Sequence, residues 1–229
     1  IATEKAGIIK SGCVVAASSQ CDEVDRVIKN TCLNRGAGLV RVGSDVTWQG
    51  LSFNLNRQLL RVKGRLDDYE LSIPLLGQHQ LDNAATAVAA LEVLAEKGFN
   101  ISGGSIIYGL ARFSCPGRLQ ILSRHPLLVV DGAHNPDAAQ KLRQALEQYF
   151  DFDQAILIIG ASSDKKVSGV ISELVPLFSK VIVTRSSHPR SMAPELIVAE
   201  FARYGVETQV ADDVPTAVSQ ALALAGDRG

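Results

Sequence analysis

The chain has 229 residues, with 23 Lys and Arg against 24 Asp and Glu, which gives a formal net charge of -1. A balanced surface lacks the clustered cations that neutralise phosphates, so composition argues against general nucleic-acid binding. Hydrophobic residues make up 46% of the chain and charged residues 21%, which excludes disorder as the main state. No apolar run approaches the roughly 18 residues that span a bilayer, and Glu4 and Lys5 precede any long apolar stretch. We therefore expect neither a membrane span nor a signal peptide.

The first part of the chain predicts a mixture of strands and helices. Residues 14–18 form a strand pattern, and residues 22–35 form a helix pattern that ends at Gly36. Three sheet segments follow, at residues 39–42, 46–55 and 58–62. A long helix is expected from about residue 80 to 97, with Leu81, Ala84, Ala85, Val88, Leu91 and Leu94 on one face, and Gly98 closes it. A shorter helix surrounds Ile106 and Leu110.

The second part alternates strands and helices regularly. Apolar runs at residues 127–131, 155–160, 180–184 and 207–211 predict strands. A helix is expected from Asn135, because Asn is a strong N-cap and Pro136 suits the first turn. Pro194 and Pro215 mark two further helix starts. Strands that alternate with helices indicate a parallel, doubly wound α/β sheet. The two parts separate near residues 113–117, where Pro and Gly interrupt the pattern.

The four cysteines do not indicate a metal site. Cys13, Cys21, Cys32 and Cys115 form no C-x-x-C pair, and no nearby histidines complete a zinc site. Reduced thiols in the cytoplasm are favoured over a disulfide.

Two clusters have both a structural and a functional interpretation. Gly77-Gln78-His79-Gln80 precedes Asp82 and Asn83 at the start of the long helix, and a helix N-terminus suits anions. Simple capping by Asp82 or Asn83 is the alternative, and it is preferred if this cluster is taken alone. Arg118 follows Pro116 and Gly117, and an arginine there can clamp a phosphate from between two domains; a solvated linker residue is the alternative, and it is preferred if this cluster is taken alone.

The segment Asp131-Gly132-Ala133-His134-Asn135-Pro136 is the most specific signal. It follows a predicted strand and opens a helix, and ligands in open α/β sheets bind at the carboxyl ends of strands. Asp131 is placed to hold a ribose hydroxyl or orient a cation there. The sequence contains no G-x-x-x-x-G-K-[ST] phosphate loop and no G-x-S-x-G nucleophile turn. The stretch from Ser186 to Arg190 follows a later strand and either lines the same edge or forms an exposed loop.

Taken together, four motifs resemble one family. They are Ile1-Ala2-Thr3-Glu4-Lys5-Ala6-Gly7-Ile8-Ile9-Lys10, His79-Gln80-x-x-Asn83-Ala84-Ala85-Thr86-Ala87, Pro116-Gly117-Arg118-Leu119-Gln120 and Asp131-Gly132-Ala133-His134-Asn135-Pro136. In this order they resemble the folylpolyglutamate synthase / dihydrofolate synthase family of Mur-type ligases. The resemblance implies an α/β fold. It assigns residues 1–112 to the C-terminal portion of a central ATP-binding domain, 113–117 to a hinge linker, and 118–229 to a Rossmann-like glutamate ligase domain.

The resemblance also implies an activity. It implies an ATP-dependent ligase that joins L-glutamate to a folate or to dihydropteroate through an acyl phosphate, with Mg²⁺ as the metal. Lys5 resembles a catalytic lysine that carries a carbamate, and His134 a residue that binds the incoming glutamate. Asn83, Arg118 and Asp131 resemble nucleotide-binding positions, with Asn83 near the base and Arg118 on the phosphates. A cytoplasmic monomer without nucleic-acid or membrane partners is expected.

Several features depart from the family pattern. The family's phosphate loop and the Glu and His that hold magnesium lie upstream of the motif that starts at Ile1. The chain ends at Asp227-Arg228-Gly229, before an expected closing strand. An internal fragment that is inactive on its own is therefore expected. Two alternatives remain: a cell-wall amino-acid ligase of the same superfamily, and a non-catalytic α/β nucleotide-binding module.

Overall fold

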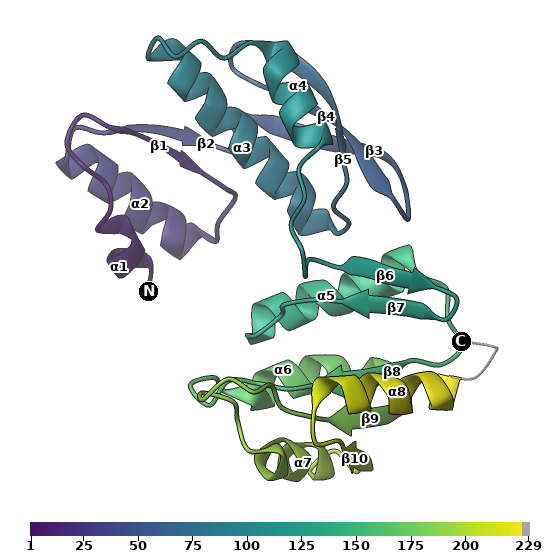
Figure 1. Ribbon diagram of the computed structural model, residues 1–229. Coiled ribbons are helices and arrows are strands. Elements are labelled where there is room, and N and C mark those ends of the chain that lie inside the picture. Colours follow the sequence, from purple (N-terminus) through teal and green to yellow (C-terminus); the bar gives the residue numbers. More distant parts are fainter. Residues whose placement is uncertain (226–229) are drawn as a thin grey trace. The chain divides into compact units, whose positions relative to one another are not determined.

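The computed structural model describes residues 1–225 and divides into two compact units, Ile1–Cys115 and Pro116–Gly229 (Figure 1). Each unit has its own helices, strands and hydrophobic core. Residues 226–229 lie outside the described part. The expectation that the chain stops before a closing strand falls on these residues and therefore also lies outside the described part. No helix within residues 1–225 combines the length and the apolar character that a bilayer crossing requires.

The first unit begins with a parallel strand pair that has helices on both faces. Its elements are α1 (Ala2–Ala6), β1 (Val14–Ala17), α2 (Asp22–Asn34), β2 (Gly38–Arg41), β3 (Thr47–Asn54), β4 (Arg57–Lys63), β5 (Asp68–Ile73), α3 (Gln78–Glu96) and α4 (Gly103–Ala111). β1 pairs in parallel with β2. Alternate side chains leave opposite faces of a strand, so Val15 packs with α1 and α2 while Val14 packs with the core around α3.

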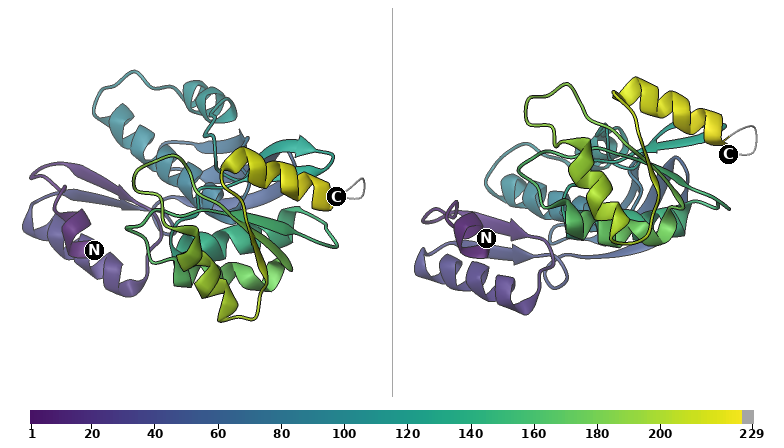
Figure 2. Two further views of the ribbon diagram at one scale, coloured as in Figure 1. Left: turned by 60° about the horizontal axis from the view of Figure 1, so that its bottom comes forward. Right: turned by 90° about the horizontal axis from the view of Figure 1, so that it is seen from below.

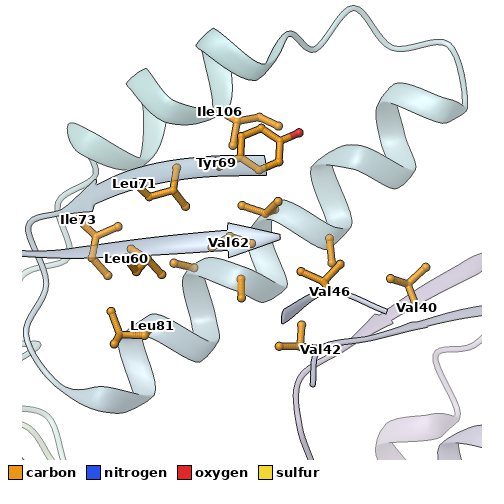
Figure 3. Packing of buried hydrophobic residues seen from close by; sticks show 14 of the residues in the cluster. Val40, Val42, Val46, Leu60, Val62, Tyr69, Leu71, Ile73, Leu81 and Ile106 are labelled. Atoms are coloured by element: carbon orange, nitrogen blue, oxygen red, sulfur yellow. The ribbon is translucent and has the colours of Figure 1, made fainter. Parts of the chain in front are cut away.

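The main core of the first unit lies between α3 and an antiparallel sheet. The sheet has the order β3-β4-β5, and its inward side chains meet one face of α3 (Figure 3). Leu60, Val62 and Leu71 are completely buried there, as are Ala85 and Val88 of α3. Burial of an aliphatic side chain is worth about 1.5–3 kcal/mol, so this interface dominates the stability of the unit. The interface also fixes the position of the first turn of α3.

The second unit contains a parallel sheet covered on both faces. Its elements are β6 (Gln120–Arg124), β7 (Leu127–Val130), α5 (Pro136–Tyr149), β8 (Ile156–Ile159), α6 (Val167–Leu174), η1 (Val175–Leu177), β9 (Lys180–Val183), α7 (Pro194–Ala202), β10 (Thr208–Val210) and α8 (Val214–Ala225). The parallel strands have the order β10-β9-β8. Val181 and Val183 pack with α6 and α7, whereas Ile182 packs with α8, whose course along the sheet is visible in Figure 2. The predicted α/β class is confirmed.

Several predicted elements differ from the observed ones. β6 and β7 form an antiparallel hairpin, so the strand at 127–130 is not part of the parallel sheet, and neither β6 nor β5 was predicted. Leu94 is 40% exposed, and the buried face of α3 includes Glu92 in its place. α3 begins at Gln78 with Gly77 as its N-cap, so neither Asp82 nor Asn83 caps the helix. The alternative that Asp82 caps the helix was therefore wrong. Its carboxylate instead accepts a hydrogen bond from Trp48 Nε1 at 2.8 Å.

Candidate functional site

The turn before α3 is held rigidly by glycine and by a buried amide. Gly77 has φ +109°, and a Cβ at this position would lie 2.6 Å from His79 Cε1, so a side chain at residue 77 would displace the imidazole. Gln58 of β4 is buried, and its Nε2 donates to the carbonyl oxygens of Leu75 at 2.7 Å and Gly77 at 3.1 Å. The turn is therefore fixed to the sheet at the point where α3 begins.

Three polar side chains in the first turns of α3 form a connected chain. Asn83 Nδ2 donates to Gln80 Oε1 at 3.1 Å, and Gln80 Nε2 lies 3.0 Å from His79 Nε2. Gln80 is buried and Asn83 is exposed, so this series of hydrogen-bonded side chains leads from the interior of the unit to its surface. The sequence singled out His79 and Asn83, and the structure brings both together through Gln80.

In the second unit, Asp131 joins two turns. Its Oδ2 accepts from the Leu119 backbone N–H at 2.8 Å, and its Oδ1 accepts from the Ala133 N–H at 2.8 Å. Leu119 is buried and has φ +42°, a left-handed conformation that is uncommon outside glycine. The Gly117 N–H donates to Gln120 Oε1 at 2.9 Å. The turn that carries Arg118 is therefore tied to the turn that carries His134.

The side chains of Arg118 and His134 are exposed beside this junction. A Cβ built on Gly132 would lie 3.8 Å from Arg118 Nη1, which places the guanidinium beside the 131–135 turn. His134 Nδ1 lies 2.9 Å from the Gly132 carbonyl oxygen, and a carbonyl only accepts, so Nδ1 carries the proton. Nε2 of the neutral ring is then left as an acceptor. Asn135 caps α5 through the Ala138 N–H at 2.9 Å, as predicted.

The described residues do not assemble a metal site by themselves. Lys5 is exposed on α1, a helix of five residues. Within residues 1–225, no group of three or more His, Cys, Asp or Glu side chains is arranged to hold a metal ion. A carbamate on Lys5 would supply oxygen ligands from a single side chain, whereas Mg²⁺ requires six ligands, so this part of the chain does not fit a complete magnesium site. All four cysteines are free thiols.

The loops after β8 and β9 are bonded to each other. The Ser163 N–H donates to the Arg190 carbonyl at 2.8 Å, and the Met192 N–H donates to the Ala161 carbonyl at 2.8 Å. A hydrogen bond from Ser162 and contact with Lys165 lower the pKa of Asp164. The stretch from Ser186 to Arg190 is exposed throughout, and its arrangement is held by backbone contacts with the turn after β8.

The predicted site residues therefore form one cluster in each unit. Arg118, Asp131 and His134 come together in the second unit, and Asn83 joins His79 in the first. Sequence reasoning missed the contributions of Gln80 and Leu119. For Gln80 the sequence did hold a signal, namely a polar residue in an otherwise apolar stripe of the helix. For Leu119 it held none, because a leucine gives no indication that its φ is positive.

Comparison with known proteins identifies the second unit first. Residues 117–229 match the family described as Mur ligase, glutamate ligase domain. The chain as a whole is similar to the dihydrofolate synthase/folylpolyglutamate synthase of Mycobacterium tuberculosis, at 30% identity over 99% of this chain and 49% of that protein. The predicted resemblance to the folylpolyglutamate synthase / dihydrofolate synthase family is thereby confirmed.

Solved structures give the same result. The M. tuberculosis folylpolyglutamate synthase complexed with ADP and AMPPCP is similar with a TM-score of 0.87 and 30% identity, over 97% of this chain and 52% of that one. The bifunctional folylpolyglutamate synthase/dihydrofolate synthase of Yersinia pestis, complexed with AMPPNP and Mn ion, is similar with a TM-score of 0.75 and 26% identity, over 99% and 50% of the two chains. The chain spans about half the length of these relatives.

Proposed function

We propose that the protein to which this chain belongs is an ATP-dependent ligase that joins L-glutamate to a folate or to dihydropteroate. The observation that carries the proposal is the junction of Arg118, Asp131 and His134 in a unit of the Mur ligase, glutamate ligase domain family. The name of the M. tuberculosis relative supports both acceptor substrates.

The proposed reaction has two steps. The γ-phosphoryl group of ATP passes to a carboxylate oxygen of the acceptor and gives ADP and an acyl phosphate. The glutamate ammonium group then loses one proton to solvent, and the resulting amine attacks the acyl carbon. The C–O bond to phosphate breaks, and the nitrogen loses a second proton, which solvent or the departing phosphate takes up, as the amide forms. A carboxylate is a poor electrophile, and phosphorylation supplies its leaving group. The groups that bind phosphate must offset the charge of the transferring phosphoryl group.

We assign the residues of this chain as follows. Asn83 contacts the nucleotide base, because its exposed carboxamide can bind in two directions. Arg118 binds phosphate oxygens through its planar guanidinium. Asp131 belongs to the nucleotide-binding set and holds the Arg118 turn. His134 Nε2 accepts a hydrogen bond from the ammonium group of the incoming glutamate, because Nδ1 is committed to Gly132.

We propose Mg²⁺ as the metal of the reaction, supported by the Mn ion in the Y. pestis relative. Lys5, as a carbamate, would bring oxygen atoms to such a metal in place of a cation. Within residues 1–225, no group of three or more His, Cys, Asp or Glu side chains is placed to complete such a site. We place the protein in the cytoplasm, which agrees with its free thiols, and we propose that it is a monomer.

The test is incorporation of radiolabelled glutamate by the protein made from the complete reading frame. We expect ATP-dependent incorporation into dihydropteroate or a reduced folate, and loss of most of it in Arg118→Ala. Thermal melting of the purified proteins checks that Arg118→Ala is folded. Incorporation of an amino acid into a nucleotide-linked cell-wall peptide, with none into pterin acceptors, would overturn the proposal in favour of a cell-wall ligase. ATP binding without any ligation would favour a non-catalytic module.

A further inference from the structure

Gln80 stands out among the polar residues of the first unit because both ends of its amide are committed. Its side chain is 7% exposed. Oε1 accepts from Asn83 Nδ2 at 3.1 Å, and Nε2 lies 3.0 Å from His79 Nε2. A buried amide that makes both bonds is held in one orientation, since flipping it would exchange its donor and its acceptor.

The orientation of Gln80 decides the orientation of Asn83. When Gln80 Oε1 accepts, Asn83 must offer Nδ2–H to it. Asn83 Oδ1 then remains an acceptor for an external group, together with the second Nδ2 hydrogen. If Gln80 were reversed, its Nε2 would donate to Asn83 Oδ1 and the outward edge would lose its main acceptor. The His79 ring agrees with this orientation, since in the tautomer with the proton on Nδ1 its Nε2 accepts from the Gln80 nitrogen 3.0 Å away.

We propose that Gln80 is a positioning residue that sets base selectivity by fixing the Asn83 carboxamide. The inference rests on the proposed function, in which Asn83 faces the base. A 6-aminopurine presents an amino donor next to the N7 acceptor, which complements an oxygen and an N–H of one asparagine. A 6-oxopurine presents two acceptors, so its O6 would face Asn83 Oδ1 without a hydrogen between them.

A purely structural role for Gln80 makes a different prediction. Loss of a buried amide would then weaken the fold and lower the affinity for every nucleotide alike. A positioning role changes the ratio of affinities for ATP and ITP, which share the ribose and triphosphate and differ at the 6-position of the base. The ratio is therefore the measurement that separates the two roles.

The experiment compares ATP and ITP binding to the protein made from the complete reading frame by calorimetry near pH 8, where an ordinary imidazole is neutral. For the unmutated chain we expect ATP to bind about 5- to 150-fold more tightly than ITP. In Gln80→Met, which has similar volume and no amide, the ratio should fall to about one or two. In Gln80→Glu the ratio should be retained, because a carboxylate oxygen still accepts from Asn83 Nδ2. Gln78→Met, at an exposed position two residues earlier, is the control for the same chemical change.

The outcomes for the inference and for the proposed function differ. If Asn83→Ala leaves the ATP preference unchanged, or if the protein made from the complete reading frame binds no nucleotide, the nucleotide part of the proposed function fails. If Asn83→Ala removes the preference while Gln80→Met keeps it, only the inference about Gln80 is overturned.

One measurement on the unmutated chain does not depend on whether the variants fold. We expect an NMR scalar coupling between the Gln80 Nε2 and His79 Nε2 nitrogens, transmitted through their N–H···N hydrogen bond. A clear coupling supports the hydrogen bond from Gln80 to His79 that fixes the amide. Its absence at neutral to alkaline pH, with both signals assigned, would overturn it.

Discussion

Asp131 and Leu119 are joined by a 2.8 Å hydrogen bond, in which the leucine N–H donates to the carboxylate across twelve residues of sequence. Leu119 is one residue beyond Arg118, and its positive φ turns the chain sharply at that point. The second carboxylate oxygen accepts from Ala133, next to His134. One aspartate thus aligns an arginine with a histidine without having to contact either side chain.

Replacement of Asp131 should loosen this junction. Asp131→Asn offers an NH₂ group to one of the two backbone N–H donors, which loses its acceptor. We expect the free energy of unfolding of the second unit to fall by about 1–3 kcal/mol, with faster amide exchange at Leu119 or Ala133. Urea unfolding and hydrogen exchange measure the two effects. Asp137→Asn is the matched control, because Asp137 is exposed on α5 and should change stability by less than about 1 kcal/mol. Equal effects of the two substitutions would contradict the role given to Asp131.

Glu92 should be a major determinant of stability in the first unit. Its buried carboxylate accepts from the backbone N–H groups of Arg65 at 2.8 Å and Leu66 at 3.0 Å, and from Tyr69 Oη at 2.9 Å. Glu92→Gln places an NH₂ group among these donors, so we expect a loss of about 2–4 kcal/mol in urea unfolding. Glu96→Gln, one turn later and only partly buried beside Arg65, should cost less than about 1 kcal/mol. A Glu92→Gln protein as stable as Glu96→Gln would show that the turn containing Arg65 and Leu66 is held by other contacts.

The same cluster predicts an alkaline pH dependence. Burial raises the pKa of Tyr69 well above its usual value, and the hydrogen bond to Glu92 raises it further. A tyrosine whose pKa is higher when folded contributes stability that is complete below its unfolded pKa of about 10 and is lost as the pH rises toward the folded value. We therefore expect the stability of the first unit to decrease above about pH 10, and Tyr69→Phe to reduce that slope. Tyr108→Phe, at a side chain that is 63% exposed, is the control. An unchanged slope in Tyr69→Phe would refute the assignment.

The 229-residue chain alone should not ligate glutamate. It contains no G-x-x-x-x-G-K-[ST] phosphate loop, and within residues 1–225 no group of three or more His, Cys, Asp or Glu side chains is arranged to hold a metal ion, so we expect Arg118 to be insufficient for stabilising a transferring phosphoryl group. An assay of the purified chain with ATP, divalent metal, pterin acceptor and radiolabelled glutamate should give only background incorporation. Turnover clearly above that of a sample without enzyme would contradict this expectation.

The sequence predicted those parts of the fold that depend on local rules. Asn135 caps α5 through its side chain, and Pro136 occupies the first turn, because both preferences act within a few residues. Pro194 opens α7, as its fit to the first helical turn predicted. The β8 and β9 strands follow from continuous apolar runs that are buried on both faces.

The parts that were missed depend on partners distant in sequence. β5 alternates polar and apolar residues, a strand pattern that went unrecognised, whereas β6 does not alternate and becomes a strand by pairing with β7. Glu92 was not predicted to be buried, because its donors come from a turn more than twenty residues earlier. At the candidate site, the motifs located Arg118, Asp131 and His134, but the bond from Asp131 to Leu119 required coordinates. The roles of the site residues stay predictions until binding is measured.

The most direct test is an ATP titration of the isotope-labelled protein made from the complete reading frame, followed by NMR of its backbone and side-chain amides. We predict that shifts concentrate at the Asn83 carboxamide and at Gly117, Arg118 and Leu119, and that Arg118→Ala removes the second group. Saturating ATP that perturbs neither place, or only the loops after β8 and β9, would contradict the assignment of the nucleotide to these residues.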